Sequence, residues 1–195
     1  MNICIYGASS NIIDKKYIDL TEELGKALAI YGHALVYGGG GEGLMGAAAR
    51  GFHQNGGKVI GVAPSFFKVD GVLFDECDEF VYTENMRQRK EIMEKRSDAF
   101  IVTPGGIGTF DEFFEIYTLR QLCRHNKPIV IYNIFGYFDE LIKMLDKAVN
   151  ENFMKPSSQK LYKVFDNPQE VCAYLENYTA EDSNISELKN ITKEA

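Results

Sequence analysis

Residues 99–112 read AFIVTPGGIGTFDE, and the change of composition along this stretch decides the fold. The run Ala99–Val102 is apolar throughout, which is typical of a strand buried on both faces of a parallel sheet. Thr103–Gly108 is small and rich in glycine, and the helical pattern Phe110–Arg124 follows it. A strand, a tight turn and a helix in this order predict one βα unit of an α/β protein.

The same succession of apolar run and helical pattern occupies most of the chain. It predicts an α/β fold of one domain, a Rossmann-like, doubly wound parallel sheet with helices on both faces. We expect residues 1–178 to form this domain and residues 179–195 to form a polar tail, frayed or loosely attached as a helix. The predicted strands are Ile3–Tyr6, Ala34–Tyr37, Lys58–Val62, Ala99–Val102 and Ile129–Tyr132, with weaker ones at Glu79–Tyr82 and Leu161–Phe165. The predicted helices are Lys16–Tyr31, Leu44–Asn55, Met86–Arg96, Phe110–Arg124, Tyr137–Glu151 and Pro168–Asn177.

Composition and charge exclude several classes of protein. The 195-residue chain is 45% hydrophobic and carries a net charge of −7, which argues against binding to nucleic-acid backbones. No apolar run approaches the about 20 residues that a membrane span needs, and we expect no signal peptide and no membrane association. The four cysteines and three histidines show no metal-ligand spacing. We therefore expect no metal site, reduced thiols and a cytoplasmic location.

Three turns of small residues follow predicted strands, and they read GASS at 7–10, GGGGEGLMG at 38–46 and TPGGIGT at 103–109. Ligands of doubly wound sheets bind beyond the carboxyl ends of the strands, where such turns meet. Glycine lets the backbone approach a ligand closely, and a helix N-terminus offers free N–H groups to a phosphate. Tight strand–helix packing alone explains a single glycine-rich turn. Two of them at one sheet edge predict a pocket for a phosphate-bearing ligand.

A dinucleotide site is one candidate for this pocket, since Gly41–Gly46 matches G-x-G-x-x-G. The match follows the second predicted strand instead of the first. The next strand ends in VAPS at 62–65, without the acid that holds a ribose diol. An NAD(P)-dependent enzyme is therefore disfavoured. The chain also lacks G-x-x-x-x-G-K-[ST], which argues against a P-loop NTPase.

Two polar groups near these turns each have a structural and a functional interpretation. Thr109 is a plausible N-cap with Glu112 three residues later, so the two residues can form a capping box. Alternatively, the Glu112 carboxylate serves catalysis beside the anion site. The basic segment Asn85–Lys90 can be a solvated helix face, although cations in a first helical turn oppose the helix dipole. A bound phosphate or Glu112 would remove that conflict.

Together these residues resemble the LOG ("Lonely guy") family, the cytokinin riboside 5′-monophosphate phosphoribohydrolases, some of which are labelled lysine decarboxylase-like. The family signature P-G-G-x-G-T-x-x-E is matched in full by Pro104–Glu112, and Met-x-x-Arg-Lys is matched by Met86–Lys90. The resemblance extends from Ile3 to about Val171. No lysine here has a context that indicates a pyridoxal phosphate Schiff base, so the decarboxylase label has no support.

Two positions depart from the family pattern. Arg87 stands where the family often has histidine. Gly71 stands where many members carry an acid, with Asp70 adjacent as a substitute. These departures bear on ribose recognition and on the preference for the base.

The resemblance implies hydrolysis of the N-glycosidic bond of a nucleoside 5′-monophosphate, such as AMP or N6-prenyl-AMP, without a metal or another cofactor. The products are the free base and ribose 5-phosphate. Glu112 is the implied catalytic carboxylate, which stabilises an oxocarbenium-like transition state or activates the attacking water. Arg89 would hold the substrate or orient Glu112. The implied substrate- and phosphate-binding residues are Gly40, Met86, Lys90, Gly105, Gly106, Gly108, Thr109 and Thr118.

The helical pattern Phe110–Arg124 is apolar on more than one side, so it is either a deeply covered core helix or a helix that also meets a partner. The resemblance implies a homodimer, in which Arg120 and Arg124 reach the neighbouring active site. The alternative function is a nucleotide or molybdenum-cofactor carrier without hydrolase activity. The Arg89 and Glu112 pair favours the enzyme, because a carrier has no use for a carboxylate near the glycosidic bond.

Overall fold

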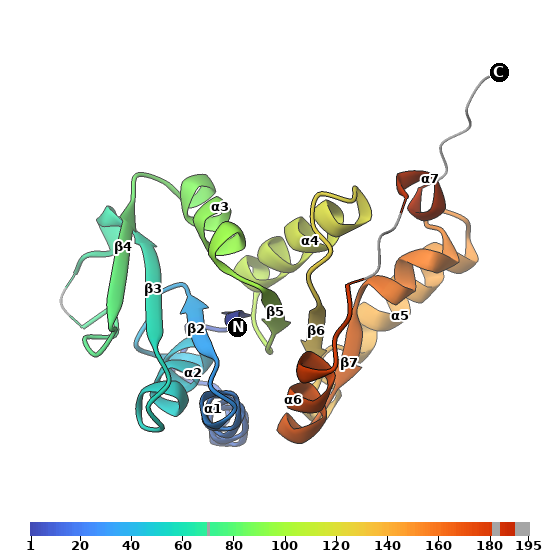
Figure 1. Cartoon of the computed structure of the whole chain (residues 1–195). Coiled ribbons are helices and arrows are strands. Elements are labelled where there is room, and N and C mark those ends of the chain that lie inside the picture. Colours follow the sequence, from blue (N-terminus) through green and yellow to red (C-terminus); the bar gives the residue numbers. More distant parts are fainter. Residues whose placement is uncertain (70, 181–183, 190–195) are drawn as a thin grey trace.

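The computed structural model describes residues 1–69, 71–180 and 184–189, and within them seven strands form one parallel sheet in the order β4-β3-β2-β1-β5-β6-β7 (Figure 1). The order runs outward from β1 in both directions, which is the topology of a doubly wound sheet. This confirms the predicted Rossmann-like fold. The strands are β1 (Asn2–Tyr6), β2 (Ala34–Tyr37), β3 (Val59–Pro64), β4 (Glu79–Thr83), β5 (Ala99–Val102), β6 (Ile129–Tyr132) and β7 (Lys163–Phe165).

Helices cover both faces of the sheet, each over its own hydrophobic core (Figure 1). One face carries α1 (Lys15–Ile30), α2 (Gly43–His53) and α6 (Pro168–Glu176), and the other carries α3 (Met86–Arg96), α4 (Ile107–Gln121) and α5 (Asp139–Asn150). Side chains of a strand alternate between the two cores, as Ile3 and Ile5 lie in the first and Cys4 and Tyr6 in the second. None of the helices in the described part of the chain is long and apolar enough to cross a membrane.

Most predicted elements are confirmed, but α4 differs at both ends. It begins at Ile107 instead of Phe110, because Gly106 is its N-cap and Gly108 lies in its first turn. The glycine content indicated a non-helical turn there. The N–H groups of the first turn of a helix have no intrahelical partners, so this glycine-rich segment serves as the start of the helix. The helix ends at Gln121 instead of Arg124, because Cys123 takes the left-handed conformation at φ 55°.

The last predicted strand is also shorter than expected. It covers Lys163–Phe165 instead of Leu161–Phe165, since Pro156–Leu161 forms a 3-10 helix. Proline at the first position of that helix has its φ angle set for a helical start and lacks an N–H that would be unpaired there. The sequence pattern alone therefore placed the start of the strand too early.

The short helix α7 (Ile185–Leu188) lies within the predicted tail and is docked onto the domain. Leu188 is buried in the core that α5 shares, and the Lys155 and Ser157 side chains donate hydrogen bonds to backbone carbonyls of α7. These contacts attach α7 to the domain, and the division of the chain into residues 1–178 and a tail stays a prediction. The parts of that tail at residues 181–183 and 190–195 lie outside the described residues.

Candidate active site

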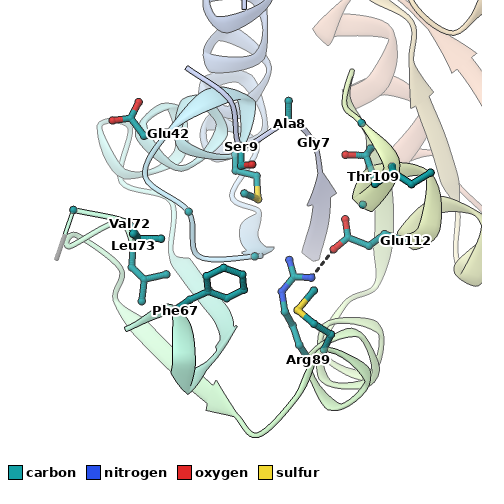
Figure 2. A pocket seen from close by; sticks show the side chains of 18 residues that line it. Gly7, Ala8, Ser9, Glu42, Phe67, Val72, Leu73, Arg89, Thr109 and Glu112 are labelled. Atoms are coloured by element: carbon teal, nitrogen blue, oxygen red, sulfur yellow. Dashed lines mark hydrogen bonds and ion pairs between the residues drawn. The ribbon is translucent and has the colours of Figure 1, made fainter. Parts of the chain in front are cut away.

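A cavity of about 610 Å³ opens beyond the carboxyl ends of β1, β2 and β5 (Figure 2). Its wall comes from the turns that follow these three strands, from the segment between β3 and β4, and from the start of α3. The cavity lies where the strand order reverses, which is the place where doubly wound sheets bind ligands. The three small-residue turns therefore converge on one site.

The N-terminus of α4 faces this cavity. Gly106, Ile107, Gly108 and Thr109 line the wall, and no side chain caps the helix. The N–H groups of a first helical turn have no intrahelical partners and carry a partial positive charge. The prediction that Thr109 is the N-cap is wrong, because the helix starts earlier and Thr109 is the third residue inside it. This end of the helix is suited to bind a phosphate.

Backbone hydrogen bonds join the three turns, and Ala8 is at their centre. The Ala8 N–H donates to the Pro104 carbonyl at 3.0 Å. The Ala8 carbonyl accepts from the N–H groups of Leu44 and Met45, at 2.8 and 3.2 Å. The turns after β1, β2 and β5 therefore hold one another in place around the cavity.

Arg89 and Glu112 form a buried ion pair in the cavity wall (Figure 2). Arg89 Nη1 donates to Glu112 Oε1 at 2.7 Å, and Arg89 Nε donates to the Val62 carbonyl at 3.1 Å. The residues are only 7% and 8% exposed. Gly38 lies against the guanidinium, and a Cβ at this position would overlap Arg89 Nη2. Glu112 is thus paired with Arg89 and is not half of a capping box.

Burial raises the pKa of Glu112 above the usual value for glutamate, and the adjacent Arg89 guanidinium opposes that rise. A carboxylate in such a site is poorly hydrated, so its interactions with nearby charges are stronger than in water. It can stabilise positive charge that develops on a sugar carbon, or accept a proton from water. The Arg89 guanidinium fixes one oxygen of this carboxylate, Oε1, through its hydrogen bond.

The structure brings several predicted binding residues to this cavity, and their individual roles stay predictions. Those that line it, besides the pair itself, are Gly40, Met86, Gly106, Gly108 and Thr109. Gly105 is buried behind the turn and contributes no wall. Of the two departures from the family pattern, Gly71 lines the cavity and Arg87 is exposed outside it. Asp70 lies outside the described residues.

Lys90 and Thr118 do not line the cavity. The Lys90 ammonium lies 2.9 Å from a carboxylate oxygen of Asp111 and also contacts the Glu115 carboxylate, so it links α3 to α4. Thr118 lies along a groove on the outer side of α4. The pattern Met-x-x-Arg-Lys suggested that both basic residues serve the ligand, but on a helix their side chains point in different directions.

Arg120 is also occupied within its own chain. Its guanidinium donates to the Lys127 carbonyl and, at 2.8 Å, to the Tyr178 hydroxyl. The implied contact of Arg120 with a neighbouring active site stays a prediction. Arg124 is exposed beyond the end of α4.

Sequence reasoning missed the apolar wall between β3 and β4. Phe67, Val72 and Leu73 line the cavity there (Figure 2). The Gly41 N–H donates to the Val72 carbonyl at 3.1 Å, which ties this segment to the turn after β2. A signal was present, since residues 66–74 contain six large apolar side chains in a stretch without helix or strand periodicity. Such exposed apolar clusters often mark binding surfaces.

The fold and the cavity define a Rossmann-like α/β protein in which an uncapped helix N-terminus lies beside a buried carboxylate. A family model described as "Possible lysine decarboxylase" matches residues 45–175. The Oryza sativa subsp. japonica protein "Probable cytokinin riboside 5'-monophosphate phosphoribohydrolase LOGL2" is 37% identical over 94% of this chain and 75% of that protein. Arabidopsis thaliana "Cytokinin riboside 5'-monophosphate phosphoribohydrolase LOG3" is 37% identical over 90% of this chain and 82% of that protein. The chain belongs to this LOG family.

Solved structures show the same fold at lower identity. A molybdenum cofactor carrier protein from Chlamydomonas reinhardtii superimposes with a TM-score of 0.68 and 22% identity, over 90% of this chain and 95% of that chain. The structural genomics target TM1055 superimposes with a TM-score of 0.70 and 20% identity, over 91% and 99%. At these identities the likeness shows the fold alone.

Proposed function

We propose that this protein hydrolyses the N-glycosidic bond of a nucleoside 5′-monophosphate, AMP or an N6-prenylated analogue, and releases the base and ribose 5-phosphate. The observation that carries the proposal is the buried Arg89–Glu112 pair at 2.7 Å, in the same cavity as the uncapped N-terminus of α4. An anion site and a poorly hydrated carboxylate are the two groups that this reaction needs. The named activity of the relatives at 37% identity supports the same reaction.

In this mechanism the 5′-phosphate binds the free N–H groups of the first turn of α4. The ribose then lies towards Glu112. As the bond between C1′ and the base nitrogen breaks, its electron pair leaves with the base and positive charge develops on the sugar ring. Glu112 stabilises this charge or takes a proton from the water that attacks C1′, and the base receives a proton. Arg89 keeps the Glu112 carboxylate oriented, because Arg89 is itself fixed by the hydrogen bond from its Nε to the Val62 carbonyl.

A carrier function is the second candidate, since molybdenum cofactor carrier proteins share the fold. A carrier requires only the anion site and a cavity. The buried ion pair favours the hydrolase. Burying two charges away from water costs free energy, and a carrier has no use for the pair that would offset this cost.

We further propose that the protein is a homodimer through the outer side of α4. Phe110, Phe114 and Leu119 line an apolar groove there together with Leu141 of α5. Phe114 is 40% exposed although it is a large aromatic residue. Ile107 lines both this groove and the cavity, so a second copy seated on the groove would also border the active site.

Light scattering tests the dimer. We expect a dimer for the parent at micromolar concentration and a monomer for Phe114→Glu, because a buried charge without a partner disfavours the interface. Met144→Glu, at an exposed apolar position of α5, is the matched control for the added charge and should stay dimeric. A monomeric parent would contradict the proposal.

A cytoplasmic location is part of the same proposal. All four cysteines, which lie in the described part of the chain, are free thiols. Disulfides are rare in reducing compartments such as the cytosol. Cell fractionation with an antibody to the protein would test the location.

Chromatography of the released bases tests the reaction. The protein is incubated with AMP and with N6-isopentenyl-AMP, and the bases are resolved and quantified. Glu112→Gln should abolish base release while AMP binding is largely kept, since the amide retains the shape but not the charge. Glu140→Gln, at an exposed carboxylate of α5, is the matched control and should retain the parent's rate. A Glu112→Gln protein as active as the parent would refute the role of Glu112, and a parent that binds AMP without releasing base would favour the carrier.

A further inference from the structure

Tyr137 reaches from the turn after β6 to the turn that precedes α4. It follows the 3-10 helix Ile134–Gly136, and its hydroxyl donates to the Gly105 carbonyl at 2.7 Å. The proposed mechanism gives this tyrosine no role. The bond is made in the turn before α4, where Gly105 and Gly106 follow each other.

The Gly105 carbonyl belongs to the same planar peptide unit as the Gly106 N–H. In a trans peptide these two groups point in opposite directions, so a donor that fixes the carbonyl also fixes the N–H. A peptide between two glycines rotates at little steric cost and needs an anchor to keep one orientation. Gly106 lines the cavity whereas Gly105 is buried behind it.

We propose that Tyr137 is a positioning residue, whose hydroxyl holds the Gly105–Gly106 peptide so that the Gly106 N–H faces the 5′-phosphate of the substrate. The preceding peptide has a similar anchor, because the Ala8 N–H donates to the Pro104 carbonyl at 3.0 Å. The carbonyls of Pro104 and Gly105 therefore both accept hydrogen bonds from the protein. The N–H groups of the same two peptides, those of Gly105 and Gly106, point in the opposite direction. The inference rests on the proposed function, since it assumes that the anion is the phosphate of a nucleotide.

Tyr137 is itself held firmly. Its ring packs edge-on against Tyr17 of α1 and against Phe138, with centroids 6.2 and 5.0 Å apart. The Phe138 N–H donates to the Asn133 side chain at 2.6 Å, and Phe135 takes the left-handed conformation at φ 55°. A non-glycine residue in that conformation persists only where its surroundings enforce it. The turn therefore presents the tyrosine hydroxyl in a fixed place.

Binding and kinetics of Tyr137→Phe test the proposal. The dissociation constant of ribose 5-phosphate should rise about three- to tenfold, the effect of losing one hydrogen bond, while that of adenosine stays unchanged. The KM for AMP should rise by the same factor, with kcat within about twofold of the parent. Tyr17→Phe is the matched control, because its ring packs against the same turn without touching Gly105, and it should leave all four constants unchanged.

The outcomes separate this inference from the proposed function. If the parent binds ribose 5-phosphate and Tyr137→Phe binds it equally well, the inference fails and the proposed function stands. If the variant loses affinity for adenosine as much as for ribose 5-phosphate, Tyr137 supports the fold generally and the inference also fails. A parent that binds neither AMP nor ribose 5-phosphate would overturn the proposed function, and this inference with it.

Discussion

Replacing Gly38 with alanine would displace the Arg89 guanidinium without removing any of its charge. Gly38 follows β2, and an added Cβ would lie 3.2 Å from Arg89 Cζ and closer still to Nη2. Carbon atoms in favourable contact are about 3.5–4.0 Å apart. The guanidinium must therefore retreat by on the order of 1 Å, since the glycine backbone is fixed between β2 and α2.

That retreat stretches two hydrogen bonds, at 2.7 Å to Glu112 and at 3.1 Å to the Val62 carbonyl. Removing one partner of a buried ion pair costs about 3–5 kcal/mol, and a displaced partner should cost less. We expect the free energy of unfolding to fall by about 2 kcal/mol, the contribution of one hydrogen bond to a charged group. A misplacement of about 1 Å in an active site can lower the rate about 100-fold, so kcat should fall by about that factor.

Urea denaturation followed by circular dichroism measures the stability, and the rate of base release measures kcat. Gly41→Ala is the matched control in the same turn, because its added Cβ meets the Leu73 carbonyl oxygen at an ordinary 3.4 Å. The control should stay within about 0.5 kcal/mol of the parent in stability. If Gly38→Ala matched the parent in both stability and kcat, the idea that Arg89 depends on this space would be refuted.

Three further predictions concern the same region. Since burial raises the pKa of Glu112 and the deprotonated carboxylate is the active form, kcat should fall with decreasing pH at a midpoint above the about 4.3 of a free glutamate. Arg89→Met should move the midpoint of the residual activity to still higher pH, and an unmoved midpoint would contradict the assignment. Thr103→Val removes a buried hydroxyl that donates to the Tyr6 carbonyl at 2.9 Å, so urea denaturation should show a loss of about 1 kcal/mol, and no loss would show that the bond does not stabilise the fold. Lys90→Met should leave KM for AMP within about twofold, because its ammonium pairs with carboxylates of α4, and a large rise in KM would place Lys90 in the binding site.

The parts of the fold that follow from local patterning could be predicted from the sequence. The predicted bounds of two elements agree with the structure, namely those of β5 (Ala99–Val102) and α3 (Met86–Arg96). A short apolar run predicts the strand, and a helical pattern that follows an asparagine N-cap predicts the helix, without information from the rest of the chain. The start of α4 could not be predicted in the same way. Glycine content indicates a turn, whereas the position of the first helical residue depends on how the turn is held by Ala8.

The partner of Glu112 also could not be derived from local spacing. A capping box with Thr109 and an ion pair with Arg89 are both compatible with the sequence, and the two interpretations differ only in tertiary structure. The ion pair joins residues 23 positions apart, on the two different helices α3 and α4. The family resemblance favoured the functional interpretation, but the contact itself appears only in the folded chain.

The hydrogen bonds around Ala8 run from main chain to main chain. Exchanging the side chains at positions 8, 44 and 45 leaves every one of those donors and acceptors in place, and only proline there would delete a donor. The apolar wall at Phe67, Val72 and Leu73 is instead made of side chains. Substitutions can therefore remodel the wall of the cavity, while the backbone framework that joins the three turns stays the same.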